Sequence, residues 1–310
     1  MRAVPPLTPL SMLSTWTLDV PVLVVLAACA TGYALGVARY SRGGRRWPVR
    51  RTRFFLGFLL SVVLVTMSFI GPYGTVLFWP RAVQTVILLM VTPLLLALSA
   101  PFTLTLETVA PRTRALLGRI GRGAPARALT FPLVITVVLI APTFLLYLTP
   151  LFELSLRSTA VHELCMLMLV LAGFGYFWTR VRVDPTPRAD SHAVSLWISV
   201  LEVVADGVLG LVIWLGPLLA HDYYQALDRQ WGPDERLDQS ISAGILWIGG
   251  DVAGLPFLGV MMTRWRAEDD KRAEEIDREL DEDSPDRDDG MQDGLWWEND
   301  PVLAERFRRH

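Results

Sequence analysis

Residues 82–100 read AVQTVILLMVTPLLLALSA, a run that contains no charged side chain. The hydrocarbon core of a bilayer is about 30 Å thick, and about 20 mainly apolar residues are needed to cross it as an α-helix. Similar runs recur along the chain, and none alternates polar and apolar residues as a strand of a membrane β-barrel does. The sequence therefore predicts an all-α fold, a polytopic membrane helix bundle. We expect about seven transmembrane helices, at residues 20–38, 54–70, 82–100, 129–148, 160–178, 195–219 and 241–262.

The composition agrees with a membrane protein. Hydrophobic residues make up 52% of the 310 residues, and the mean hydropathy is +0.38. Both values exceed those of ordinary soluble domains. The sequence contains no Gly-rich phosphate loop, no nucleophile elbow and no zinc-protease motif. We therefore expect neither an enzyme nor a nucleic-acid partner.

Arginine residues gather in alternate connections between the predicted spans. Seven lie at residues 39–53, five at 112–127 and three at 180–188, whereas the opposite connections hold few. Cytoplasmic loops of membrane proteins carry the excess of positive charge. The sequence therefore predicts an N-terminus outside the cell and a C-terminus in the cytoplasm. Lys271 is the only lysine, a bias typical of GC-rich bacterial genomes, and we expect a bacterial plasma membrane.

The charge also divides the chain. Residues 268–310 hold 17 acidic and 7 basic residues, although the formal net charge of the whole chain is only −2. We predict three parts: a short extracytoplasmic segment at 1–18, a transmembrane domain at 19–265 and an acidic cytoplasmic tail at 266–310. The first part of the tail is compatible with an extension of the last helix, and we expect disorder after Asp281 because little there can be buried. The tail either solubilises the protein or docks to a partner or to lipid through Trp296 and Trp297.

A few polar side chains fall inside the predicted fifth span. His162, Cys165 and Met166 stand at positions i, i+3 and i+4, so they share one helix face. Imidazole, thiol and thioether are the donors that Cu(I) prefers. Met168 lies on another face of an ideal helix and needs a kink to join them. The alternative is that these residues only pack and hydrogen-bond within the bundle.

Acidic side chains fall inside the predicted sixth and seventh spans. Glu202 and Asp206 stand at i and i+4, and Asp251 lies in the last span. Carboxylates at membrane depth are costly and often functional. Two interpretations stay open, a proton relay and a buried structural network with Asp251 or with the basic loops.

Short motifs occur in a characteristic order. Residues 78–85 read FWPRAVQT, and the run LLMVTPLLL at 88–96 leads to Ala100-Pro101. The later motifs are Thr149-Pro150-Leu151, Leu156-Arg157-Ser158, His162, Ala172-Gly173, Asp184-Pro185, Trp231-Gly232, Asp238-Gln239, Ala243-Gly244, Trp247 and Gly250-Asp251. In this order the motifs resemble the CtaG-type (caa3-type) cytochrome c oxidase assembly proteins, over about residues 54–262.

The resemblance implies an integral membrane assembly factor whose partners are cytochrome c oxidase subunits and membrane lipid. It also implies copper insertion into the catalytic subunit, or maturation of that subunit, from the outer face. Most histidines of the family pattern are replaced. Those of the third helix fall on Arg81 and Thr85, one of the fifth falls on Met168, and one of the sixth falls near Asp206, while His162 remains.

Two functions are therefore expected as alternatives. The first is a copper-handling factor that holds copper with His162, Cys165, Met166 and Met168. The second is a metal-free scaffold or chaperone that binds oxidase subunits through its helices, Arg81 and its tail. A weaker alternative is a transporter that uses the buried acids. Outside the metal set, the residues expected to matter are Arg81, Gln84, Glu202, Asp206, Asp238, Gln239, Trp247 and Asp251.

Overall fold

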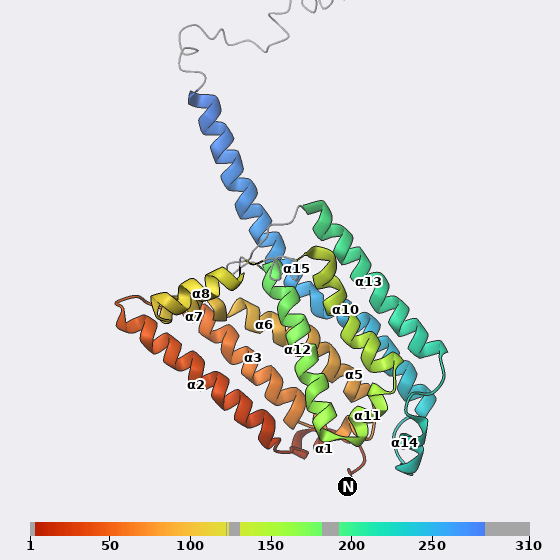
Figure 1. Cartoon of the computed structure of the whole chain (residues 1–310). Coiled ribbons are helices and arrows are strands. Elements are labelled where there is room, and N and C mark those ends of the chain that lie inside the picture. The colour runs from red at the N-terminus through yellow and green to blue at the C-terminus, as the bar shows by residue number, and fades with distance from the viewer. Residues whose placement is uncertain (1–3, 122, 124–130, 182–191, 283–310) are drawn as a thin grey trace, which may run out of the picture. The chain divides into compact units, whose positions relative to one another are not determined.

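The computed structural model describes residues 4–121, 123, 131–181 and 192–282. Within these residues all regular secondary structure is helical (Figure 1). The chain divides into two compact units, Met1–Gly259 and Val260–His310. The Asp184-Pro185 motif and residues 283–310, with the predicted disorder and Trp296-Trp297, lie outside the described residues.

The helices follow the hydropathy pattern, and each predicted span overlaps a helix. The elements are α1 (Pro9–Ser14), α2 (Val20–Arg42), α3 (Val49–Met67), α4 (Ile70–Tyr73), α5 (Phe78–Val86), the π-helix η1 (Ile87–Val91), α6 (Thr92–Leu98), α7 (Pro101–Thr108), α8 (Pro111–Gly121), α10 (Pro132–Leu148), α11 (Leu151–Arg157), α12 (Thr159–Val181), α13 (His192–Leu215), α14 (His221–Ala226) and α15 (Glu235–Glu282). The all-α prediction is confirmed for the described residues.

Among the described residues, three helical stretches are long and apolar enough to cross a membrane: Val20–Arg42, Phe78–Thr108 and Thr159–Val181. A fourth candidate is the pair Leu133–Leu148 and Leu151–Arg157, which is bent by 72°. The total of seven spans and their orientation stay predictions.

A π-helical turn at η1 lets two central helices approach each other closely. Pro93 has no N–H to donate to the Leu89 carbonyl, so the regular ladder of α-helical hydrogen bonds is interrupted in this segment. On the facing helix α12, a Cβ at Gly173 would lie 2.0 Å from the Leu89 oxygen. Only glycine fits there, which explains the Ala172-Gly173 motif as a packing feature.

A second close approach joins α13 to α15. A Cβ at Gly210 would lie 2.8 Å from the Cβ of Trp247 and 3.1 Å from the Ala243 oxygen, and the Trp247 ring also covers Gly207. Small residues allow such contacts between membrane helices. Trp247, which the sequence singles out, therefore packs the α13–α15 interface.

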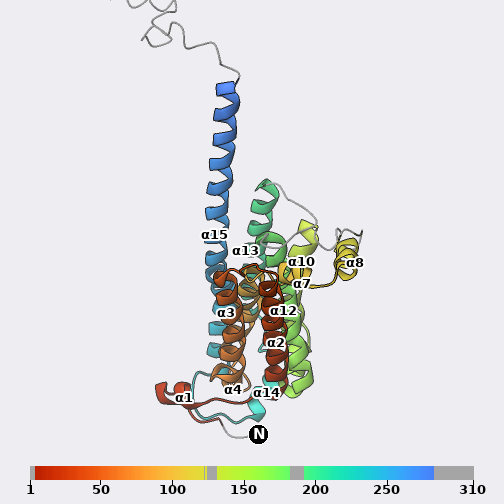
Figure 2. The ribbon, with the colours of Figure 1, turned by 90° about the vertical axis from the view of Figure 1, so that its left-hand side faces the viewer.

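The two ends of the first unit differ in character. The connection from α2 to α3 and helix α8 lie at one end, which we call the basic end (Figure 1). Helices α1, α11 and α14 lie at the opposite end (Figure 1), and Figure 2 shows α1 and α14 there from another side. Arg180 closes α12 at the basic end, whereas α5 starts near α11 at the opposite end.

Candidate functional site: two buried arginine clusters

Helix α5 begins with a cap that a distant helix supplies. Leu77 provides no side-chain cap, and instead Asp238 of α15 accepts hydrogen bonds from Phe78 N (2.9 Å) and Trp79 N (3.0 Å). A carboxylate at a helix N-terminus satisfies free amide groups and complements the helix dipole. Burial raises the pKa of the Asp238 carboxyl, and the two backbone donors oppose that rise. Asp238 thereby fixes the first turn of α5.

Gln239 performs the corresponding task at the end of α13. Its Nε2 donates to Ile213 O (2.7 Å) and to Pro217 O (2.9 Å), and its Oε1 accepts from Leu219 N (2.8 Å). These groups have no helical partners of their own because α13 ends at Leu215. The Asp238-Gln239 motif thus ties two helix ends to α15.

Arg81 lies in the first turn of α5, with 5% of its surface exposed. Its Nη1 donates to Gln84 Oε1 (3.2 Å) and contacts His162 Nε2 (3.3 Å). Its Nη2 donates to Ser155 Oγ (3.0 Å) on α11. In the part of the chain that the structure describes, no carboxylate lies within ion-pair distance of this guanidinium. A buried cation is therefore held by neutral acceptors alone.

The contact with Arg81 determines the state of His162. A guanidinium has only donors, so His162 Nε2 must accept, and the imidazole is neutral with its proton on Nδ1. That Nδ1 is buried and has no hydrogen-bond partner among the described residues. The lone pair that would bind a metal is directed at a cation instead.

Further hydrogen bonds connect Arg81 to the surrounding helices. Gln84 Nε2 donates to Val65 O (2.9 Å) on α3 and contacts Met166 Sδ (3.5 Å) on α12. Thr85 Oγ1 donates to Arg81 O (3.0 Å) and lies 2.7 Å from the Tyr147 hydroxyl on α10. We call the group of residues Arg81, Gln84, Thr85, Tyr147, Ser155, His162 and Met166 the Arg81 cluster. It joins five helices through polar contacts.

The predicted copper ligands do not all meet. His162, Cys165 and Met166 line a small cavity of about 10 Å³ beside Arg81 and Gln84, with room for about one water molecule. Met168 instead lines an apolar groove between α10 and α12 with a volume of about 520 Å³. Met168 therefore lies on another face of α12, which runs without a break from Thr159 to Val181.

The Arg81 cluster does not fit a copper ion. Arg81 cannot coordinate a metal, and its fixed positive charge repels a cation at this distance. Among the described residues no group of three or more His, Cys, Asp or Glu side chains is arranged to hold a metal ion. The thiol and thioether of Cys165 and Met166 are the donors that remain at the cavity.

A second buried arginine lies at the basic end. Arg180 Nη2 is 3.9 Å from Glu202 Oε1, and the two side chains are only 5% and 15% exposed. Tyr176 donates to Glu202 Oε2 (2.7 Å), and the Arg180 guanidinium lies 5.2 Å from the Tyr176 ring centre. We call Tyr176, Arg180 and Glu202 the Arg180 cluster.

The acids predicted from the sequence lie near this cluster. A Cβ at Gly250 would lie 2.8 Å from Asp206 Oδ2, so α13 brings this carboxyl against the backbone just before Asp251. The sequence pointed to Glu202, Asp206 and Asp251 but missed Tyr176 and Arg180. The signal was present, since Tyr176 and Arg180 stand four residues apart on one face of α12.

Comparisons with known proteins identify relatives. A family profile described as cytochrome c oxidase caa3 assembly factor (Caa3_CtaG) matches residues 31–268. Uncharacterized proteins of Mycobacterium bovis and Mycobacterium tuberculosis are each 25% identical over 283 residues, 89% of this chain and 43% of theirs. A Mycobacterium leprae protein is 23% identical over 276 residues, 86% of this chain and 42% of its own length. The chain therefore spans less than half the length of these curated relatives. No solved structure matches the chain.

Proposed function

Because the chain belongs to the cytochrome c oxidase caa3 assembly factor family, we propose that it works in oxidase assembly as a metal-free membrane scaffold. In this proposal the protein crosses a bacterial plasma membrane seven times, with its N-terminus outside and its C-terminus in the cytoplasm. It binds oxidase subunits within the membrane and supports maturation of the catalytic subunit from the outer face.

The observation that carries the metal-free form of the proposal is the position of Arg81. Its guanidinium lies 3.3 Å from the Nε2 atom of His162 and 3.2 Å from the Oε1 atom of Gln84. By the family resemblance, Arg81 occupies a position where the pattern has histidine. In this proposal the guanidinium takes the place beside His162 that a bound copper ion would need, and it holds the surrounding helices in one arrangement.

Metal analysis of Arg81 variants tests this proposal. We expect the full chain, purified in detergent after growth with copper, to carry no more copper than a mock purification. Arg81→His removes the fixed charge and adds an imidazole beside His162, Cys165 and Met166, so this variant should gain bound copper. Arg81→Gln is the matched control, because it removes the charge without adding a ligand.

Co-purification from native membranes provides the second measurement. An oxidase subunit should accompany the wild-type chain and the His162→Ala variant equally. If the wild type binds copper, and both His162→Ala and Met166→Ala abolish that binding, then the copper-handling function is correct and the metal-free scaffold is wrong. If no oxidase component accompanies any variant, the role in oxidase assembly itself is contradicted.

A further inference from the structure

The basic end of the first unit exposes an unusual surplus of positive charge. The exposed arginines there are Arg39, Arg42, Arg45, Arg46, Arg50, Arg53, Arg112, Arg114 and Arg119. Glu107 is the only acidic residue in the sequence between Asp19 and Glu153. We call these nine arginines the basic surface. One carboxylate in this part of the sequence cannot neutralise nine arginines, so the surface can bind further anions.

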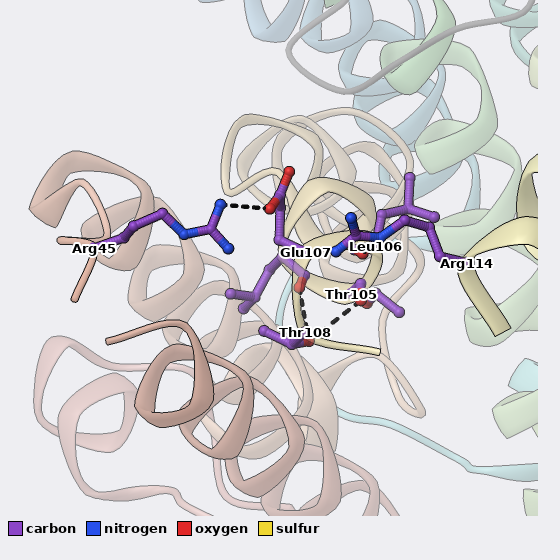
Figure 3. Close-up of polar contacts among 7 residues, drawn as sticks. Arg45, Thr105, Leu106, Glu107, Thr108 and Arg114 are labelled. Atoms are coloured by element: carbon purple, nitrogen blue, oxygen red, sulfur yellow. Dashed lines mark hydrogen bonds and ion pairs between the residues drawn. The ribbon is translucent and has the colours of Figure 1, made fainter. Parts of the chain in front are cut away.

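Two contacts join the parts of the basic surface. Arg45 Nη1 lies 2.6 Å from Glu107 Oε2, which connects the α2–α3 loop to α7 (Figure 3). Arg114 Nε donates to Leu106 O (2.6 Å), which ties α8 back to α7 (Figure 3). The carboxylate of Glu107 is thereby paired with Arg45, within the basic surface. Within the described residues, the other arginines of the basic surface have no carboxylate partner.

Helix α8 has the pattern of a helix that lies in a membrane interface. Leu116 and Leu117 are 55% and 38% exposed. At 100° per residue, Arg112 and Arg119 project on one flank of these leucines. In such an arrangement long arginine side chains can reach lipid headgroups while the leucines face acyl chains. A surface that bound only soluble anions would not need exposed leucines between its arginines.

Aromatic residues beside the basic surface are of the types that concentrate at a membrane interface. The Arg51 guanidinium lies 4.8 Å from the ring centre of Trp47, and that of Arg45 lies 4.4 Å from the ring centre of Tyr40. Trp and Tyr concentrate at membrane–water interfaces. Arg45 of the basic surface and the nearby Arg51 thus lie beside the residue types that favour the headgroup level of a membrane.

We propose that the basic surface is a binding site for anionic phospholipid headgroups of the adjoining leaflet, with α8 embedded in the interface through Leu116 and Leu117. The arginines pair with lipid phosphates in place of the missing carboxylates. This inference goes beyond the role in oxidase assembly and does not depend on it, nor on which side of the membrane the basic end faces.

Lipid retention and thermal unfolding of the full chain in detergent test the site. Phosphatidylglycerol should stay bound several-fold more than phosphatidylcholine in native mass spectra, and should raise the melting temperature more. The double variant Arg112→Gln/Arg119→Gln should lose most of this preference. Arg157→Gln/Arg236→Gln, which removes two exposed arginines from the opposite end, should keep it. All these side chains are exposed, and melting curves without added lipid check that each variant is folded.

Two further measurements distinguish a lipid headgroup from a soluble phosphate as the bound anion. Leu116→Gln/Leu117→Gln leaves the charge unchanged and should still weaken phosphatidylglycerol binding, because the acyl-chain contact is lost. Soluble glycerol phosphate should not displace the lipid. Equal retention of the two lipids, an equal loss in the control variant, or full displacement by glycerol phosphate would each overturn the proposal.

Discussion

Arg81 and Arg180 are both buried in the helix bundle, yet their surroundings differ. Arg81 makes hydrogen bonds or close contacts with the neutral side chains of Gln84, Ser155 and His162. Arg180 faces the carboxylate of Glu202 at 3.9 Å, but its Nε, Nη1 and Nη2 atoms have no hydrogen-bond partner among the described residues. Arg81 therefore has hydrogen-bonding partners within bonding distance, but none of them carries a negative charge. Arg180 has a negatively charged partner, but the ion pair is long and makes no hydrogen bond.

The difference shows that the two arginines serve different purposes. Both charges are buried among packed helices, and a buried charge is costly unless it is paired or hydrogen-bonded, so each must be compensated. Directed hydrogen bonds to α5, α11 and α12 fix the Arg81 guanidinium in one position. A long ion pair between α12 and α13 constrains Arg180 less, because Coulomb attraction depends weakly on direction. We infer that Arg81 acts as a rigid structural centre and that Arg180 holds two helices together more loosely.

Removing Arg81 should give the largest loss of stability and is the most direct test of the difference between the two arginines. Arg81→Ala leaves buried acceptors on Gln84, Ser155 and His162 without a donor, and we expect a loss of about 3 kcal/mol in unfolding free energy. Arg81→Lys should recover only part of it, because an ammonium cannot span acceptors on both sides as the planar fork does. Thermal unfolding in detergent measures both. Equal stability of Arg81→Lys and the wild type would show that charge alone matters at this position.

Removing the partner of Arg180 should have a smaller effect. Glu202→Gln keeps an acceptor for the Tyr176 hydroxyl but leaves Arg180 without its counter-charge. Because the ion pair is long, we expect a loss of about 1 kcal/mol, less than for a well-formed buried pair. The double variant Arg180→Met/Glu202→Gln should restore most of this loss. Glu153→Gln, which breaks an exposed ion pair with Arg157, is the control and should change stability little. A loss as large as that of Arg81→Ala would contradict the distinction.

Cysteine labelling in intact cells tests on which side of the membrane each arginine cluster lies, and it does not depend on a change in stability. In a chain with Cys29→Ser and Cys165→Ala, a cysteine introduced by Glu153→Cys reports on the Arg81 end, and one introduced by Arg46→Cys reports on the basic end. The alternating arginine bias predicts that a membrane-impermeant maleimide labels the first in intact cells and the second only after lysis. The opposite result would place the Arg81 cluster near the cytoplasm and contradict action from the outer face.

The sequence predicted the individual helices better than it predicted the functions of single residues. Asp238 and Gln239 stand out as a motif, and their resemblance to an assembly factor suggested a functional role. The structure shows that they cap α5 and anchor the end of α13. Sequence spacing cannot reveal this task, because Phe78 and Asp238 are 160 residues apart.

The candidate copper ligands show the same limit of prediction from sequence. Helical spacing correctly grouped His162, Cys165 and Met166 and separated Met168 from them. It could not show that the guanidinium of Arg81, from another helix, contacts the His162 nitrogen. Whether a set of soft donors faces a metal or an internal cation depends on a residue 81 positions away in the chain.

What the sequence alone determined is local: which stretches are apolar enough to form helices, where arginines and acids accumulate, and which residues share a helix face. These properties follow from composition and from the 3.6-residue period. Only the tertiary structure decided how buried charges are compensated, because hydrogen bonds require atoms of distant segments within about 3 Å of each other. The identity of the group that faces His162 was decided at that level.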